Sequence, residues 1–308
     1  MITSSALRSF LSWRRAAALL LTSCTLALAA CSANSSDGTP SFSTSTSDPG
    51  TGHLHGLGVD PADGAVYAAG HLGVFRIDGG KAARIADRYQ DTMGFTVTGP
   101  RTFLGSGHPD PSDPKATSPH LGLIRSTDAA KTWKSVSASG KADFHALQAA
   151  GDQLYGFDSQ SGQLWASSNQ GRTWQQRATE VMGDLAAHAS QPERVWATTR
   201  EGLKVSEDGG RTFTPVPGAP ALAAIDRPSP DLLVALTADG RVVTSRDGTA
   251  WSERGRLPDG ARPTVLAAPS PSRLLAADAT DTIHESTDGG RSWNLLYRGA
   301  DEAHSGHY

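Results

Sequence analysis

The sequence contains very little cysteine: among its 308 residues only Cys24 and Cys31 are cysteines, and both lie near the N-terminus. The chain after residue 31 therefore has no disulfide and no thiol nucleophile, so a domain built from it must rest on its core. A large excess of charge of either sign is lacking too, because 28 basic residues nearly balance 31 acidic ones. This balance excludes the basic face of a nucleic-acid-binding protein, and we expect no nucleic-acid partner.

Long hydrophobic runs are also lacking. The apolar stretch over residues 16–30 is too short to span a bilayer comfortably. Three arginines, Arg8, Arg14 and Arg15, precede it, and small residues followed by Cys31 end it. This pattern resembles the lipobox of bacterial lipoproteins. The resemblance implies that residues 1–30 are a signal peptide and that Cys31 carries the lipid, which would anchor the protein on the extracytoplasmic face of the cell membrane. An ordinary signal peptide with a chance cysteine is the alternative.

Turn-forming residues are abundant, with 33 glycines and 18 prolines, which suits an all-β fold with many turns. Residues 31–52 are rich in Ser, Thr, Gly and Pro and carry almost nothing apolar, so they indicate a flexible linker. Residues 300–308 are too few for a further structural unit and indicate a C-terminal tail. The folded domain is therefore predicted over residues 53–299.

A short motif recurs five times in this domain. Its copies read STDAAKTW (126–133), SSNQGRTW (167–174), SEDGGRTF (206–213), SRDGTAW (245–251) and STDGGRSW (286–293). Their first serines lie 41, 39, 39 and 41 residues apart, a period typical of repeat architectures. In such a turn the Asp or Asn side chain accepts from nearby backbone N–H groups, while glycine supplies a conformation that other residues resist. We expect looser turns at Ala130 and in the shortened fourth copy.

The motif resembles the Asp-box, or BNR repeat, of sialidases and related β-propellers. On this resemblance the structural acid or amide of each box is Asp128, Asn169, Asp208, Asp247 or Asp288. Between boxes the sequence reads as four short strands, with apolar alternation broken at Gly, Asp and Asn. The frame gives six units, at about 53–90, 91–143, 144–181, 182–220, 221–260 and 261–299. We therefore predict an all-β, six-bladed propeller with four antiparallel strands in each blade.

Histidines are predicted to gather on one face of this propeller. The box joins the third and fourth strands of a blade, so the start of the innermost strand and the loop between the second and third strands share the opposite face. Positions there are His53, His55, Met93, His145 and Met182 at strand starts, and His71, His108 and His120 in loops. Functional sites of propellers usually lie on such a face, around the central channel.

These residue types favour a transition-metal site. The candidate ligands are His53, His55, His71, Met93, His108 and His145. Imidazole suits several transition metals and thioether prefers Cu(I), so copper is the first expectation and zinc the second. Acid–base work near neutral pH is the competing use of the histidines, and unrelated polar or core roles are the alternative for each one singly.

Glycoside hydrolysis is the alternative function. The first blade opens on HLHGL, where sialidases carry the first of their three arginines. The later innermost strands start without a supported arginine, and no tyrosine opens a late blade. The sequence also resembles bacterial lipoproteins labelled glycosyl hydrolase, and such chemistry needs two carboxylates. Weak catalytic candidates are Asp110, Asp184 and Glu180, each of which we expect to be a solvated loop acid. A monomeric scaffold that binds a surface protein is the third hypothesis.

Overall fold

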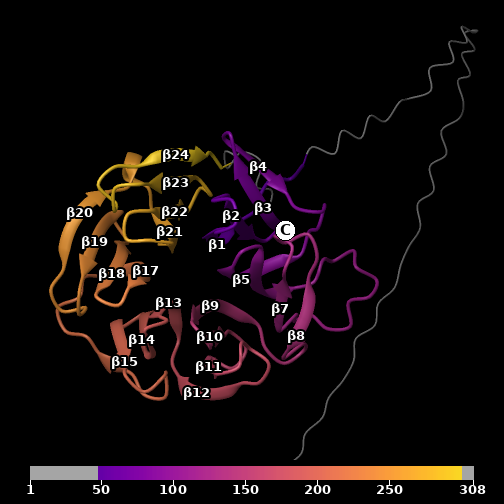
Figure 1. Ribbon diagram of the computed structural model, residues 1–308, viewed down its shortest axis with the longest axis horizontal. Coiled ribbons are helices and arrows are strands. Elements are labelled where there is room, and N and C mark those ends of the chain that lie inside the picture. Colours follow the sequence, from indigo (N-terminus) through magenta and orange to yellow (C-terminus); the bar gives the residue numbers. More distant parts are fainter. Residues whose placement is uncertain (1–47, 300–308) are drawn as a thin grey trace, which may run out of the picture. The chain divides into compact units, whose positions relative to one another are not determined.

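The computed structural model describes residues 48–299, which form six four-stranded sheets around a central axis (Figure 1). Each sheet uses four consecutive strands that pair in antiparallel fashion, so every repeat unit of the sequence makes one blade. Four antiparallel strands in each of six blades define a six-bladed β-propeller. The fold class predicted from the repeat is confirmed.

The strands of the first three blades are β1 (Leu54–Val59), β2 (Val66–Gly70), β3 (Gly73–Asp78), β4 (Lys81–Arg84), β5 (Asp91–Gly99), β6 (Thr102–His108), β7 (Leu123–Ser126), β8 (Lys134–Ser137), β9 (Phe144–Ala150), β10 (Gln153–Asp158), β11 (Gln163–Ser167) and β12 (Gln175–Thr179). Those of the last three are β13 (Met182–His188), β14 (Gln191–Thr199), β15 (Gly202–Ser206), β16 (Thr214–Pro215), β17 (Leu222–Ser229), β18 (Leu232–Thr237), β19 (Arg241–Ser245), β20 (Ser252–Arg256), β21 (Pro263–Ala267), β22 (Leu274–Asp278), β23 (Ile283–Ser286) and β24 (Asn294–Tyr297).

The ends of the chain lie partly outside this description. The predicted signal peptide, the lipidation residue Cys31 and the tail 300–308 all fall outside residues 48–299. The last residues of the expected linker pack on the first blade: Arg84 donates two 2.8 Å hydrogen bonds to the carboxylate of Asp48, and Thr51 is buried. Within the described range, no helix is long and apolar enough to cross a membrane.

Six hydrophobic clusters form the core, and each fills the space between two neighbouring blades. Between the fourth and fifth blades, for example, Trp196 packs with Ile225 and Val243. A blade is therefore buried on both faces, which explains why every residue of strands such as β2 and β22 is buried. Burial of these faces holds the ring of blades together.

The ring closes between the sixth and first blades without a shared sheet, because each sheet takes its strands from one unit. Side chains of both blades meet in one cluster that joins Leu54 and Phe75 to Leu275 and Ile283. The backbone N–H of Leu54 also donates to Asp281 Oδ1 at 2.9 Å. Closure thus depends on packing and on contacts of this kind.

The repeated turns connect the third and fourth strands of five blades. In the copy on β15, Ser206 Oγ accepts from Gly210 N at 2.7 Å, and Asp208 Oδ1 accepts from Thr212 N at 2.9 Å. Gly210 has φ +82°, and a Cβ on it would lie 2.3 Å from Leu164 of the preceding blade. Glycine is therefore required there both by the backbone conformation and by the close approach of the preceding blade.

The looser turn expected at Ala130 is not seen. Ala130 adopts a left-handed φ of 66°, and its N–H still donates to Ser126 Oγ at 2.9 Å. Asp128 also accepts from Thr132 N at 2.9 Å, as the corresponding Asp208 does from Thr212. The side-chain hydrogen bonds hold this turn although alanine replaces the glycine.

Candidate functional site

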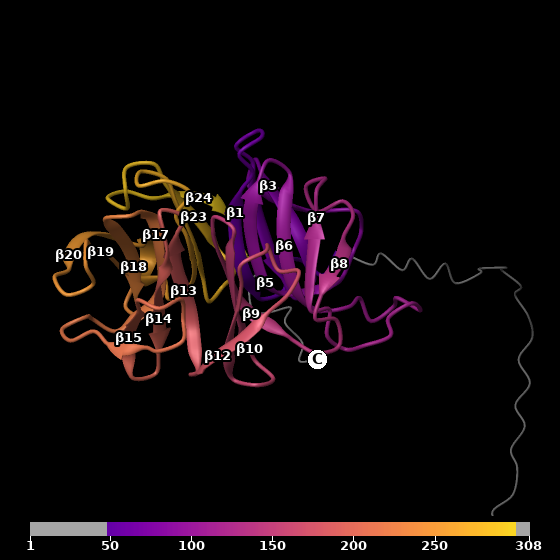
Figure 2. The same ribbon diagram turned by 60° about the horizontal axis from the view of Figure 1, so that its bottom comes forward.

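The starts of the innermost strands meet the β2–β3 and β6–β7 loops on one face of the propeller, which we call the strand-start face. His55 and His145 lie near the starts of β1 and β9, and His53 immediately precedes β1. His71 lies in the β2–β3 turn, and His108 ends β6. The loop that follows β6, residues 109–122, carries His120 and projects from the second blade (Figure 2).

A channel runs along the axis behind this face. It has a volume of about 440 Å³, and residues of all six innermost strands line it. His55 and His145 line its end at the strand-start face, and His188 lines it near the C-terminal ends of those strands. A small ligand in the channel would therefore contact two of the predicted histidines.

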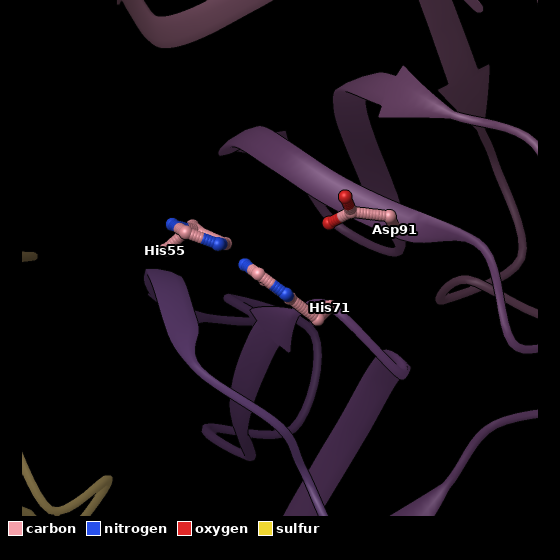
Figure 3. Close-up of side chains that lie close together, drawn as sticks. All are labelled: His55, His71 and Asp91. Atoms are coloured by element: carbon pink, nitrogen blue, oxygen red, sulfur yellow. The ribbon is translucent and has the colours of Figure 1, made fainter. Parts of the chain in front are cut away.

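Three side chains from two blades converge beside the channel. His55, His71 and Asp91 each offer a nitrogen or oxygen atom, and these three atoms lie within 4.8 Å of one another. The rings of His55 and His71 stack with centroids 4.7 Å apart, and the carboxylate of Asp91 faces them from the start of β5 (Figure 3). We call this set the first His/Asp group.

The first group contains buried atoms that lack a protein partner. Within the described part of the chain, His55 Nε2 and Asp91 Oδ1 are buried and accept or donate no hydrogen bond. Burial, followed by the nearby imidazoles of His71, His53 and His145, lowers the pKa of His55 to about 3. His55 is thus neutral at physiological pH, which is the protonation state that a metal ligand requires.

A second His/Asp group lies next to the first. His108, His120 and Asp143 also bring one ligand atom each within 4.8 Å of one another. The side chain of Asp143 is only 2% exposed, whereas that of His108 is 36% exposed. Among residues 48–299, His120 Nδ1 and Asp143 Oδ1 are further buried atoms without a hydrogen-bond partner. Both groups therefore combine imidazoles with a carboxylate and leave ligand atoms unpaired.

Direct contacts join the two groups. His108 Nδ1 lies 2.9 Å from Asp91 Oδ2, and His108 Nε2 lies 3.5 Å from Asp143 Oδ2. That oxygen of Asp143 also lies 2.9 Å from His145 Nε2 and from Ser159 Oγ. Burial alone would raise the pKa of Asp143, but these hydrogen bonds and the two nearby histidines outweigh it and lower the pKa to about 2. Asp143 is therefore ionised.

His53 lies at the edge of the first group. Its ring centroid is 5.0 Å from that of His55, and its Nδ1 is 3.5 Å from Asp281 of the sixth blade. The hydrogen bond to Asp281 raises the pKa of His53. His53 therefore takes up a proton more readily than an ordinary histidine, and it contacts the seam where the ring closes.

The methionines lie differently from the histidines. Met182, expected on the histidine-rich rim, is 4% exposed and packs in the core between the third and fourth blades. The expected rim position of this side chain is wrong. Burying an apolar side chain in the core is more favourable in free energy than exposing it to water at the rim. Met93 is half-buried on β5, two residues after Asp91, which is the residue of this strand that enters the first group.

Two of the weak catalytic candidates serve their own loops or neighbours. Asp110 accepts from Tyr89 N, Ser112 N and Ser112 Oγ, and the hydrogen bond from Ser112 contributes most to lowering its pKa. Glu180 accepts from Lys204 Nζ at 2.8 Å. Each of the two carboxylates therefore has hydrogen-bond donors of its own, and the two share none of these donors.

Asp184 is not the solvated loop acid that the sequence suggested. Its two oxygens accept from the backbone N–H groups of Leu185 and Ile225, both at 2.9 Å. Asp226 repeats this one blade later, with Arg227 and Ala268 as donors. Burial raises the pKa of Asp184 to about 7, with the charge of Asp226 adding to the effect, and raises that of Asp226 to about 6. Both aspartates tie one innermost strand to the next.

The sequence prediction did not include the carboxylates of Asp91 and Asp143 among the candidate metal ligands. Asp91 and Asp143 stand two residues before Met93 and His145, the position that His53 occupies relative to His55. An alignment of the units shows this shared two-residue offset at three strand starts. Residues two apart on a strand point to the same side, so each Asp was a candidate neighbour of the imidazoles.

Comparisons with known proteins support the fold. No family model matches the chain, and no curated protein matches its sequence. Among solved structures it resembles a GH74 xyloglucanase from Xanthomonas campestris, with 20% identity and a TM-score of 0.53, over 80% of this chain and 45% of that one. It resembles YCF48 bound to a D1 peptide, with 17% identity and a TM-score of 0.51, over 80% and 82% of the two chains.

A third similar structure is the nidogen/laminin complex, with 12% identity, a TM-score of 0.56, and coverage of 76% of this chain and 93% of that one. The chain spans less than half the length of the xyloglucanase that it matches. At these identities the likeness establishes a β-propeller fold and leaves function to the site itself.

Proposed function

We propose that this protein is a metal-binding propeller whose first His/Asp group holds a divalent transition metal. The observation that carries the proposal is the convergence of His55, His71 and Asp91, with His55 Nε2 and Asp91 Oδ1 buried and unpaired within the described residues. Polar atoms in such a position cost free energy unless they find a partner. A bound cation would supply that partner to both atoms.

The donor set supports zinc more than copper. Two imidazoles and one carboxylate, with a fourth position left for water or a substrate, are ligands that Zn²⁺ takes. The earlier preference for copper depended on a thioether, and the first group consists of nitrogen and oxygen donors. Copper remains the second choice, with Met93 as the residue that would favour it.

Zinc titration of the purified full chain, after treatment with a chelator, tests this function. We expect tight binding in the wild type and the loss of one tight site, by about 100-fold or more in affinity, in His71→Ala. The matched control is His188→Ala, which removes a histidine whose Nδ1 lies 2.9 Å from Ser190 Oγ, and it should bind as the wild type does. No binding tighter than about micromolar, or equal binding in His71→Ala, would overturn the proposal.

The cellular setting of this function is part of the proposal. We infer an Asp-box propeller lipoprotein, anchored through Cys31 on the extracytoplasmic side of the membrane, because the lipobox-like sequence and the repeated turns agree with that class. Metabolic labelling with a fatty-acid analogue should mark the wild type and fail to mark Cys31→Ala. Unlabelled wild type, or labelled Cys31→Ala, would contradict lipidation at this residue.

A glycosidase is the second candidate, and one observation favours it. Asp184 lines the central channel and has a pKa raised by burial to about 7, which suits a general acid. A screen with aryl glycosides, with and without zinc, tests it. Turnover that Asp184→Asn abolishes would favour the enzyme, and absence of turnover across sugar classes would leave the binding function.

A further inference from the structure

We propose that the second His/Asp group binds a second metal ion, and that Asp91 couples the two centres by ligating the first metal and orienting His108 for the second. This inference rests on the proposed zinc site at the first group. The second group has its own three ligand atoms within 4.8 Å of one another, from His108, His120 and Asp143.

The contacts of His108 determine which nitrogen can bind the metal. The carboxylate of Asp91 only accepts hydrogen bonds, so the 2.9 Å contact places a hydrogen on His108 Nδ1. The other ring nitrogen, His108 Nε2, lies 3.5 Å from Asp143 Oδ2. A metal ion in place of a proton between these two atoms would take Nε2 and the carboxylate as ligands.

The surroundings of Asp143 support the same assignment. Its carboxylate is nearly inaccessible to solvent, yet Oδ1 has no hydrogen-bond partner within the described residues. His120 Nδ1, also unpaired, belongs to the same group. A buried carboxylate with an unpaired oxygen is stabilised by a nearby positive charge, which a second metal ion provides.

Asp91 uses a different oxygen for each centre. Its Oδ2 contacts His108, while its Oδ1 has no hydrogen-bond partner among residues 48–299, so we assign Oδ1 to the metal at His55 and His71. A carboxylate that accepts the N–H of a metal-bound histidine fixes the ring and makes it a stronger ligand. Asp91 is thus a ligand of the first centre and a positioning residue for the second, and removing its charge weakens both.

Metal counting and zinc competition titrations on the purified full chain test this arrangement. We expect two zinc ions per wild-type chain and one in either His71→Ala or His120→Ala. In His71→Ala the remaining site should keep its wild-type affinity. Asp91→Asn should lose the first site and weaken the second by about 10- to 100-fold, the range for an orienting partner of a metal ligand. Asp78→Asn, an equal change of charge at an exposed position on β3, should keep both sites.

The outcomes separate this inference from the proposed function. One zinc per wild-type chain, lost in His71→Ala and kept in His120→Ala, would overturn the second site and leave the first. Full affinity of the second site in Asp91→Asn would overturn the coupling. No zinc at all would overturn both proposals. If Asp91→Asn does not fold by circular dichroism, His108→Gln replaces it and should lose the second zinc alone.

Discussion

The innermost strands carry aspartates in two kinds of surroundings. In the fourth and fifth blades, both oxygens of Asp184 and of Asp226 accept backbone N–H groups, one of them from the next blade. In the second and third blades, Asp91 and Asp143 contact imidazoles and each leaves one buried oxygen unpaired within residues 48–299. Aspartates therefore connect neighbouring blades in the fourth and fifth blades. In the second and third blades they leave an unpaired oxygen that could bind a ligand.

The largest expected effect is on stability, from removing an aspartate that connects blades. Asp184→Ala leaves the N–H groups of Leu185 and Ile225 without their acceptor, and we expect unfolding to become easier by about 2–4 kcal/mol. Chemical denaturation checks this value, with exposed Asp78→Ala as the control. Zinc affinity should be unchanged, because Asp184 lies outside both His/Asp groups. Equal stability of the two variants would abolish the distinction between the two kinds of aspartate.

Zinc binding at the His/Asp groups should also raise the stability of the folded protein. A ligand present at 100 times its Kd stabilises the folded state by about 2.7 kcal/mol, so saturating zinc should raise the Tm of the wild type. Because His71→Ala lacks a ligand of the first group, its Tm should rise less. Thermal scans with zinc and with a chelator measure the difference. A Tm that is the same in both conditions would show that the unpaired atoms do not receive the metal.

The repeated turns should respond to mutation as stability elements only. Ser206 is buried, and its hydroxyl accepts from Gly210 N, so Ser206→Ala should cost about 1–2 kcal/mol of unfolding free energy. The control is Ser252→Ala at an exposed position of β20. Zinc titrations of the two variants should coincide with that of the wild type. A change in zinc affinity in Ser206→Ala would connect the turns to the site.

The last prediction concerns the dependence of stability on pH. The folded-state pKa of Asp184 is raised by burial to about 7 from an ordinary 3.8, so between these values the folded state holds a proton that the unfolded state has lost. The contribution of this group to stability therefore falls as pH rises from about 4 to 7. Asp184→Asn cannot titrate, so the Tm difference between wild type and Asp184→Asn should narrow over that range. A constant difference would mean that Asp184 is ionised throughout.

The fold was predictable because the box recurs five times at a regular spacing. Spacing of the box serines fixed the units, and apolar alternation between them fixed four strands in each. Histidine positions could be assigned to one face for the same reason, since equivalent positions of a propeller share a face. His55 and His71 now form part of one group, and His108 and His120 part of the other.

What the sequence could not supply is the direction and pairing of individual side chains. Met93 and Met182 occupy comparable strand starts, yet Met182 is buried in a core cluster. Asp184 was expected to be a solvated acid, and the structure pairs it with backbone donors. The structure also buries the side chain of Asp143 beside histidines, which its position in the sequence did not indicate. Such differences depend on neighbouring blades, and a single sequence read one unit at a time does not contain them.

Closure of the ring without a shared sheet has a consequence for protein engineering. Because every blade is one continuous segment, the chain could begin at a different blade without changing which blades lie next to each other. Residue 48 and strand β24 both lie beside the first blade, through the contact of Asp48 with Arg84 and the bridge between Gly80 and Tyr297. A circular permutant that joins these ends and opens at the exposed Gly218 would keep all six sheets intact and both His/Asp groups on one uninterrupted segment.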